Sequence, residues 1–299
     1  MIVNAAMSEF EIICIGAAKF DAVAAVEDFP REDGRIQADT LQDAIGGPAV
    51  TAAVAIARLG VPVAFCGVIG RDSAGDRIME RLEEERIGTR WVTRSGEVRT
   101  ARSMNIVARR NASRTIITVP AAAPDPAVVA SLKAPWMHFD DVGYASAPAR
   151  KQPRNGVKLS IDGGNYIRDL DLQGIDLYAP TIVRLAAEHS AGSPRQLMQS
   201  AVARGAREVV ATDGANGSYV LSNDKFECVP AFKTEIVSTL GAGDVFHGGL
   251  LAGLCLGKNL TEATGWGNAC AALSCRALDG MTMAPTRAEV EALLATRHG

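Results

Sequence analysis

Short apolar runs alternate with segments of helical periodicity along most of the chain. Runs rich in β-branched and other apolar residues predict strands at Glu11–Ile15, Val63–Ile69, Trp136–Phe139, Leu159–Ile161, Ile175–Tyr178 and Glu208–Ala211. Apolar positions at helical spacing predict helices over Pro48–Leu59, Asp76–Arg86, Val245–Leu256 and Glu262–Leu278. Strands that alternate with helices are typical of a mostly parallel sheet with helices on both faces, so we expect a three-layer α/β fold.

Two segments, 18–45 and 100–120, depart from this alternation because they favour strands with no helix between them. Within the second segment, residues 102–108 and 113–119 are expected to form neighbouring antiparallel strands joined at Arg110 and Asn111. We interpret both segments as a small β lid over a cleft. The remaining residues, 1–17, 46–99 and 121–299, are then expected to form the α/β core that carries the nucleotide and catalytic sites.

Composition narrows the class of protein. The chain has 299 residues, 47% of them hydrophobic, and a formal net charge of −3. This balance is typical of a globular protein and argues against a nucleic-acid partner. The apolar stretch 48–70 is interrupted by Arg58 and Pro62, so no membrane span is expected. The six cysteines form no C-x-x-C pair, and the first residues show no signal peptide, so we expect reduced thiols and a cytoplasmic location.

The strongest chemical signal is the segment Gly241-Ala242-Gly243-Asp244, which precedes an apolar helix. Glycines at a helix N-terminus let the backbone present N–H groups to an anion, and the helix dipole favours that anion. An aspartate at this point suits the acceptance of a proton from a hydroxyl that attacks a phosphate. The alternative is a glycine turn in which Asp244 is an ordinary N-cap. Neither the P-loop pattern nor the dinucleotide-binding glycine pattern occurs here, which argues against a Rossmann dehydrogenase.

Three further segments carry weaker signals. Gly46 and Gly47 would let a ligand approach the backbone where a small-residue helix begins, although a plain strand-to-helix turn has the same pattern. Asp21 follows the first predicted strand and could bind sugar hydroxyls, or it could be a surface aspartate. The segment 212–217 lies at the expected carboxyl edge of a parallel sheet, where ligands bind, or forms a hairpin turn.

In order and spacing, these segments resemble the ribokinase-like (PfkB) family of carbohydrate kinases over nearly the whole chain. The segments 46–60 and 65–75 match the family's first motif and the stretch after it, and 241–244 matches its second motif. The segment 268–273 resembles the late helix that borders the adenine site. The resemblance implies a ribokinase-like fold and an ATP-dependent kinase that acts with Mg²⁺ on a hydroxyl of a sugar or sugar derivative. It also implies a homodimer formed through the β lid.

The resemblance assigns roles to individual residues. Asp244 would be the catalytic base, and the N–H groups of Gly241, Ala242 and Gly243 would form an anion hole. Residues expected at the nucleotide are Thr212, Gly214, Gly217, Thr239 and Asn268. Residues expected at the substrate are Asp21, Gly46, Gly47 and Thr51. Arg35 is added for its charge, which could favour an anionic sugar, although it could also be a solvated charge on the lid. His247 is expected to be a packed helix residue rather than a catalyst.

The chain departs from the family pattern at positions that bear on metal ions. The second motif usually opens with aspartate, and Ser238 stands there, which leaves activation by a monovalent cation open. The family's Asn-x-x-Glu should fall near Pro180, where the chain has Thr181 to Arg184 instead, with Glu188 one turn further on. No metal ligands are therefore assigned. The alternatives to a sugar kinase are a nucleoside kinase and a catalytically impaired sugar-binding or regulatory relative.

Overall fold

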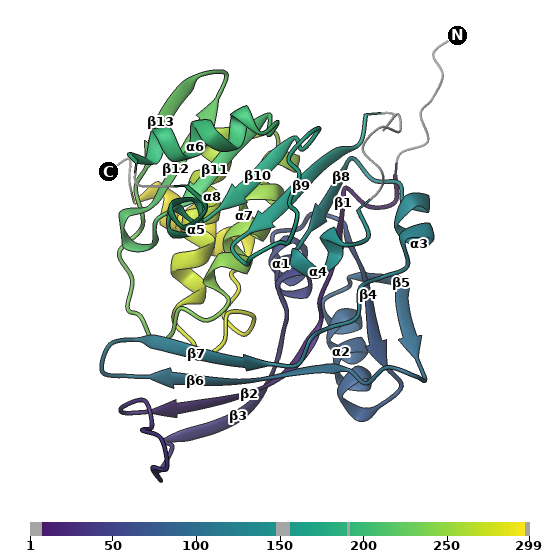
Figure 1. The fold of residues 1–299 in the computed structure, drawn as a ribbon, viewed down its shortest axis with the longest axis vertical. Coiled ribbons are helices and arrows are strands. Elements are labelled where there is room, and N and C mark those ends of the chain that lie inside the picture. The colour runs from purple at the N-terminus through teal and green to yellow at the C-terminus, as the bar shows by residue number, and fades with distance from the viewer. Residues whose placement is uncertain (1–7, 148–155, 190–191, 297–299) are drawn as a thin grey trace.

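A computed structural model describes residues 8–147, 156–189 and 192–296. Within these residues the central sheet has nine strands (Figure 1). Their order across the sheet is β13 (Lys225–Val229), β12 (Ser218–Ser222), β11 (Glu208–Thr212), β10 (Leu177–Pro180), β9 (Lys158–Gly163), β8 (Trp136–Phe139), β1 (Ile12–Ile15), β4 (Val63–Gly70) and β5 (Gly88–Ser95). Neighbours from β11 to β5 pair in parallel, and β12 and β13 are antiparallel. The expected mostly parallel sheet is confirmed.

A second sheet of four strands lies across the end of the central sheet (Figure 1). Its order is β3 (Thr40–Gly46), β2 (Lys19–Val26), β6 (Ala101–Ala108) and β7 (Ser113–Thr118). The strands come from the two segments that lacked helical periodicity, and β6 and β7 form the expected antiparallel hairpin. We call this sheet the lid. The start of β6 is tied to the core because Thr100 donates its N–H and its hydroxyl to the Asp72 carboxylate, at 2.9 and 2.6 Å.

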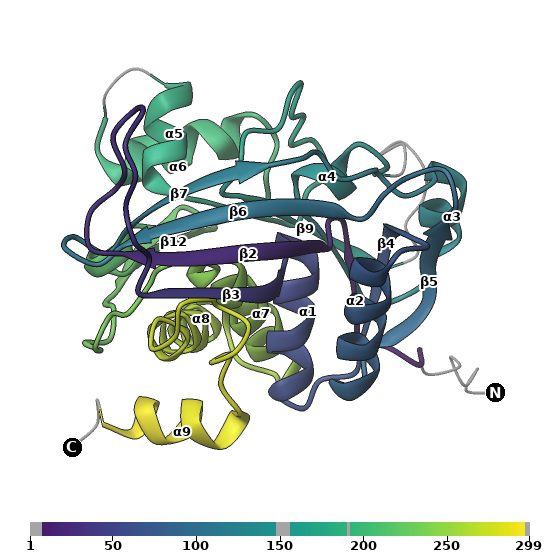
Figure 2. The ribbon, with the colours of Figure 1, turned by 90° about the horizontal axis from the view of Figure 1, so that it is seen from below.

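Helices cover both faces of the central sheet, and Figure 2 shows the two groups on opposite sides of the lid. One face carries α1 (Pro48–Arg58), α2 (Ser73–Glu84), α7 (Ala242–Cys255), α8 (Leu260–Ser274) and α9 (Arg287–Ala295). The other carries α3 (Pro126–Ser131), α4 (Asp141–Tyr144), α5 (Ile182–Glu188) and α6 (Pro194–Ala203). Each group encloses its own apolar cluster against the sheet. No helix in the described part of the chain has the length and apolar character to cross a bilayer.

Small residues let the helices of the first group pack closely. A Cβ on Gly248 of α7 would lie 2.6 Å from the Ala55 Cβ of α1, and one on Gly249 would lie 2.7 Å from the Cys270 sulfur of α8. The alanine and glycine residues of these helices therefore bring α1, α7 and α8 together. This packing holds the N-termini of α1 and α7 at the same edge of the sheet as the lid.

Some predicted elements have other boundaries in the structure. The last strongly predicted helix ends at Ser274 rather than Leu278, because the Cys275 carbonyl accepts from the N–H groups of Val237 and Ser238. β5, β12, β13 and the helices α3–α6 and α9 had no individual prediction. All six cysteines are free thiols.

Candidate active site

The Gly241–Asp244 turn opens α7 as predicted. Gly241 is the N-cap residue with φ of 76°, a left-handed conformation that glycine adopts without steric cost. The first intrahelical bond joins the Val245 N–H to the Gly241 carbonyl at 3.0 Å, so the N–H groups of Gly243 and Asp244 have no intrahelical acceptor. The Ala242 N–H donates to the Thr239 carbonyl at 3.3 Å. Gly243 is exposed, and the space where its Cβ would lie is open.

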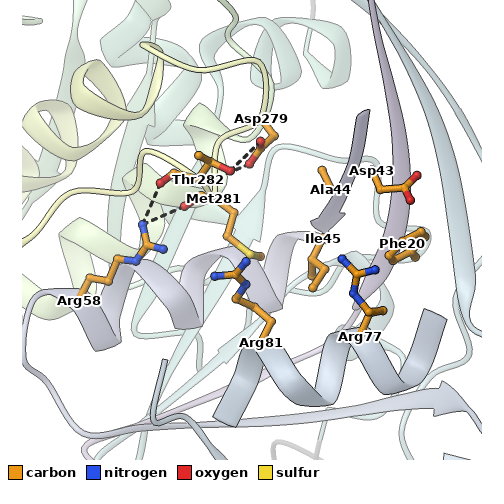
Figure 3. A pocket seen from close by; sticks show the side chains of 10 residues that line it. All are labelled: Phe20, Asp43, Ala44, Ile45, Arg58, Arg77, Arg81, Asp279, Met281 and Thr282. Carbon is orange, nitrogen blue, oxygen red and sulfur yellow. Dashed lines mark hydrogen bonds between the residues drawn. The ribbon is translucent and has the colours of Figure 1, made fainter. Parts of the chain in front are cut away.

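The loop 279–284 supports this turn from behind. Gly280 packs on it so closely that a Cβ there would lie 2.7 Å from both the Gly241 Cα and the Leu240 carbonyl. Arg58, at the end of α1, holds the loop. Its Nη1 donates to the carbonyls of Met281 and Thr282, both at 3.1 Å (Figure 3), and to the Ala284 carbonyl at 2.8 Å. Its remaining nitrogens bond the Glu85 carboxylate.

The same loop also contacts the lid. The Asp279 carboxylate accepts from the N–H and hydroxyl of Thr282, at 2.8 and 2.9 Å, and from Gln42 Nε2 of β3 at 3.3 Å. A pocket of about 170 Å³ lies beside it; its lining includes Ile45, Arg77 and Arg81 (Figure 3). Strand β3, the loop and the Gly241–Asp244 turn are therefore neighbours.

Two carboxyl groups near the turn titrate well above their usual range. Desolvation, with the Asp162 carboxylate as the next cause, raises the pKa of the half-buried Asp244 to about 8. The positive charge of Arg114 on β7 lowers the pKa of Asp244, against these two effects. Arg114 Nη1 donates to the Thr239 hydroxyl at 2.9 Å. Desolvation also raises the pKa of Asp140, a fully buried residue after β8, to about 7.

Asp140 joins the first strand, α1 and α4. Its carboxylate accepts the N–H groups of Ala17, Ala49 and Gly143 at 2.7, 3.2 and 2.8 Å. A Cβ on Gly16 would lie only 1.9 Å from Asp140 Oδ1, so only glycine fits at position 16. Sequence reasoning missed Asp140, although its position after a predicted strand at the ligand-binding edge was a usable signal.

A buried ion pair lies behind Asp244. His247 Nε2 is 3.1 Å from Asp162 Oδ1 at the end of β9, and the side chains are 6% and 8% exposed. Burial lowers the pKa of His247, but the Asp162 carboxylate outweighs it and the net pKa is raised. His138 on β8 lies beside the pair, with its ring centroid 5.5 Å from that of His247 and its Nδ1 3.1 Å from the Ser160 hydroxyl. His247 is packed, as predicted, and it also contacts a carboxylate.

The residues predicted for the substrate gather where the lid meets α1, with one exception. A Cβ on Gly46 would lie 2.2 Å from Asp21 Oδ2, and one on Gly47 would lie 2.5 Å from the Ala17 carbonyl, so both glycines are required. Asp21 is 7% exposed and Thr51, in the first turns of α1, is 3% exposed. Arg35 does not join them, because it lies in the exposed loop between β2 and β3, at the opposite end of these strands from Gly46.

Asn105 on β6 is a polar residue that sequence reasoning missed. It is 1% exposed, and within the described residues no well-formed hydrogen bond satisfies its amide atoms or Asp21 Oδ1, although the amide is close enough to the Asp21 carboxyl to lower its pKa. Register places both on one face of the lid, because β6 pairs Ser103 with Asp21 and Asn105 with Val23. Burial raises the pKa of Asp21. Unpaired buried polar atoms are costly unless a ligand satisfies them, so this inner lid face is suited to a ligand with hydroxyl groups.

Three arginines and the aromatic residue of the lid point elsewhere. Arg109 and Arg110 pair with Asp39 and Asp28. Arg102 lies 5.3 Å from the centroid of the Phe20 ring. Phe20 precedes Asp21 and therefore faces away from the inner side, and it lines the pocket of Figure 3. No aromatic side chain of the described lid strands stands on the inner face.

The residues predicted for the nucleotide lie along β11 and its neighbours. Thr212 ends β11, and Gly214 and Gly217 have φ of 54° and 96° in the tight turn that follows. This turn joins the antiparallel strands β11 and β12, so it is also a hairpin turn, the alternative that the sequence left open. The Asn268 amide accepts from the Ser218 hydroxyl at 2.6 Å and donates to the carbonyls of Val229 and Pro230. It therefore fixes the end of β13.

No magnesium cage is visible. In the three described stretches, no group of three or more His, Cys, Asp or Glu side chains is placed to hold a metal. Glu188 pairs with Arg204 at 2.9 Å, and the buried Ser238 hydroxyl accepts the Leu240 N–H at 3.1 Å. An Mg²⁺ ion that enters with ATP would then be held mainly by phosphate oxygens and water.

Comparisons with known proteins agree with this geometry. The family model "pfkB family carbohydrate kinase" matches residues 9–143 and 181–287. A ribokinase of Haemophilus influenzae is 27% identical over 300 residues, covering 92% of this chain and 95% of that protein. The solved ribokinase of Giardia lamblia superposes with a TM-score of 0.84 at 20% identity, over 97% of this chain and 100% of that one. An Arabidopsis thaliana ribokinase complexed with ribose and ATP gives 0.78 at 22% identity, covering 95% and 98%.

The family match covers most of the chain, and its two motifs lie where the lid and the α7 turn meet. The chain therefore belongs to the pfkB family of carbohydrate kinases and has the ribokinase-like fold. It is a phosphotransferase of the sugar and nucleoside kinase class.

Proposed function

We propose that the protein transfers the γ-phosphoryl group of ATP to a hydroxyl of a neutral sugar, with Asp244 as the catalytic base. One observation carries the proposal: Asp244 stands in the first turn of α7, directly after an N–H-lined glycine turn, and has a raised pKa. A base whose pKa is near the working pH both accepts a proton and remains largely available. The relative solved with ribose and ATP supports these two substrate types.

The step balances as follows. Asp244 accepts the proton of the attacking hydroxyl, the hydroxyl oxygen forms a bond to the γ-phosphorus, and the bond to the β–γ bridging oxygen breaks to release ADP. The N–H groups of Gly243 and Asp244 are aimed where negative charge develops. Because the Ala242 N–H already donates to the Thr239 carbonyl, we take the N–H groups of Gly243 and Asp244, rather than that of Ala242, as the proposed anion hole.

The inner lid face selects the acceptor. Asp21 and Asn105 supply buried carboxylate and amide atoms that hydroxyl groups can satisfy, and Gly46 and Gly47 allow close approach at the start of α1. The Asp21 carboxylate would repel an anionic sugar, and the lid arginines Arg109 and Arg110 are engaged elsewhere. Lys19, on the same face as Asp21, donates to the Thr118 hydroxyl at 3.0 Å. A neutral polyol therefore fits better than a sugar acid.

The nucleotide would lie between α7 and the Thr212–Gly217 turn. Thr212, Gly214, Gly217 and Thr239 would line its phosphates or ribose, and Asn268 would act indirectly by holding the backbone at Val229 and Pro230. Arg114 reaches this side from the lid. Mg²⁺ would enter with ATP and neutralise its phosphates. A potassium requirement is tested by replacing potassium with choline in the assay.

A second copy of the chain would cover the outer lid face. Leu41, Met104, Ile117 and Val119 are 74%, 52%, 59% and 62% exposed, and the strand register places them together on the side opposite Asp21. Contiguous exposed apolar residues mark association surfaces. Analytical ultracentrifugation should show a dimer that becomes a monomer in Leu41→Lys/Ile117→Glu; an unchanged species would refute this interface.

The test of the reaction is ADP release with Mg-ATP across ketoses, aldoses, sugar acids and nucleosides, with Asp244→Asn as the control. We expect turnover on a neutral sugar and a loss of about 10²- to 10⁴-fold in the variant, the size of a general-base contribution. Turnover that survives in Asp244→Asn would refute the base. Calorimetric sugar binding with no turnover on any sugar would favour a binding or regulatory protein.

A further inference from the structure

Arg184, in the first turn of α5, is a half-buried arginine that lacks a counterion among the described residues. The other half-buried arginines that the structure describes each pair with a carboxylate: Arg58, Arg81, Arg94, Arg204 and Arg276. Within residues 8–147, 156–189 and 192–296, the Arg184 guanidinium forms no ion pair and no hydrogen bond, and its Cζ lies 5.2 Å from the centroid of the Tyr166 ring. A partly desolvated cation without a partner is costly, so Arg184 is suited to an anionic ligand.

The carboxyl edge of the central sheet carries Arg184, and ligands of α/β folds bind at this edge. β10 ends at Pro180, and the next residue, Thr181, forms a parallel bridge with Thr212 at the end of β11. The Thr181 hydroxyl accepts the Arg184 N–H at 3.0 Å, which places Arg184 in the first turn after this edge. Thr212 is one of the residues proposed for the nucleotide. Arg184 therefore lies within one helical turn of a residue that adjoins the proposed nucleotide position.

The loop after β9 supplies the aromatic ring against which Arg184 lies. At the start of this loop, the Gly164 N–H donates to the carboxylate of Asp162 at 2.7 Å, and Asp162 in turn contacts His247 of α7. Tyr166 follows in the same loop and is 64% exposed. A guanidinium that lies against an aromatic ring keeps its N–H donors available, because they point outward in the guanidinium plane. This loop therefore connects the surroundings of the α7 turn with the Arg184 side chain.

We propose that Arg184 binds the β- and γ-phosphates of the nucleotide. The inference rests on the proposed ATP-dependent reaction and adds a phosphate-binding residue to it. The nucleotide is proposed to lie between α7 and the 212–217 turn, where Asp162 and Asp244 supply no positive charge. Arg114 offers a guanidinium from the lid, and Arg184 offers one from the core. An arginine donates two N–H groups to phosphate oxygens at once, so it both orients the terminal phosphates and offsets their charge.

The test compares a nucleotide that carries the terminal phosphates with one that lacks them. Isothermal titration calorimetry gives the Kd of Mg-ATP and of AMP for the wild type, Arg184→Gln and Arg184→Glu. Arg184→Gln should weaken ATP binding by about 10- to 100-fold, the size of a hydrogen-bonded contact between charged groups, and leave AMP binding unchanged. Arg184→Glu should weaken ATP binding further, because a carboxylate repels the phosphates. An unchanged Kd for ATP in Arg184→Gln, or an equal loss for AMP, would overturn the proposal.

Arg207 provides a matched control for the loss of one positive charge. It directly precedes β11, so it lies at the amino edge of the same sheet, opposite the proposed site. Its side chain is 76% exposed, and its Nη1 is 3.9 Å from Asp176 Oδ1. Arg207→Gln should therefore leave the Kd of Mg-ATP unchanged. A loss of ATP affinity in Arg207→Gln as large as that in Arg184→Gln would reveal a general effect of net charge and overturn the assignment.

Tyr166 variants test how the guanidinium is held. Tyr166→Phe keeps the ring and should keep the ATP affinity, whereas Tyr166→Leu should weaken ATP binding about threefold, because the contact between cation and ring is lost. Wild-type ATP affinity in Tyr166→Leu would refute the role of the ring. A wild-type protein that binds neither ATP nor AMP would refute the proposed function, whereas ATP binding that does not depend on Arg184 would refute this inference alone.

Discussion

Arg58→Ala should weaken both the stability and the turnover of this kinase, because one guanidinium joins α1, α2 and the loop behind the anion hole. Its Nη1 serves the carbonyls of three loop residues, and its other nitrogens bond Glu85. The substitution would leave those carbonyls without their donor and Glu85 without its principal cation. Arg81 remains near Glu85, at 3.7 Å.

The structure sets the size of the effect. The Arg58 and Glu85 side chains are 21% and 13% exposed, so the pair is mostly but not fully desolvated. Removing one partner of a fully buried pair costs about 3–5 kcal/mol, so about 3 kcal/mol of unfolding free energy is expected here. For a chain of this size that corresponds to a fall in Tm of about 6 °C. Turnover should also fall, because Gly280 in this loop packs directly against Gly241.

The assay combines thermal unfolding with steady-state kinetics for Arg58→Ala, Arg58→Lys and the control Arg287→Ala. The control removes an exposed pair, since Arg287 and Glu291 are 53% and 50% exposed, and should change Tm very little. The Tm of Arg58→Lys should lie between those of the wild type and Arg58→Ala, because a lysine ammonium cannot bond the loop carbonyls and the Glu85 carboxylate at once as the planar guanidinium does. In the alanine variant, kcat should fall more than sugar affinity. If Arg58→Ala keeps the wild-type Tm and kcat, the proposed role of Arg58 in holding the loop 279–284 is refuted.

Three further outcomes follow from the site. Gly241→Ala and Gly257→Ala introduce similar backbone strain, because both glycines have a positive φ, 76° and 79°. Only Gly241 has a close neighbour, Gly280, so activity should be lost in Gly241→Ala and kept in Gly257→Ala. Equal loss of activity in two variants that circular dichroism shows to be folded would contradict this. Arg114→Ala should raise the KM for ATP and lower kcat, together about tenfold, whereas Arg110→Ala, which breaks only an outer pair, should not. Wild-type kcat/KM should rise about tenfold per pH unit below pH 8 and level off above it, because only ionised Asp244 accepts the proton; a flat profile would contradict the assignment.

Local sequence signals located the parts of the site that depend on backbone conformation. The glycines at 46, 47 and 241 predicted close approach or positive φ, and the structure shows both. The interruptions in helical periodicity located the lid strands. These features depend on residues near in sequence, so a linear pattern can carry them.

The buried polar network could not be found in this way, because its members come from different strands. Asp140, Asp162 and His247 belong to different elements of the fold, so no local pattern of residues shows that they meet in space. Parallel strand pairing of β8 with β9 brings the two aspartates to one edge, and α7 packing adds His247. The sequence places Arg35 in the lid, and it does lie between two lid strands. It lies far from Gly46, however, because the loop between β2 and β3 is at the opposite end of these strands.

Phosphorus NMR of the reaction mixture follows whether the γ-phosphoryl group passes to a sugar hydroxyl under the control of Asp244. With Mg-ATP and the sugar that gives the fastest ADP release, we expect equal growth of ADP and a sugar phosphate monoester, with both absent in Asp244→Asn. Growth of ADP and inorganic phosphate without a sugar phosphate, or a sugar phosphate that forms equally fast in Asp244→Asn, would contradict it.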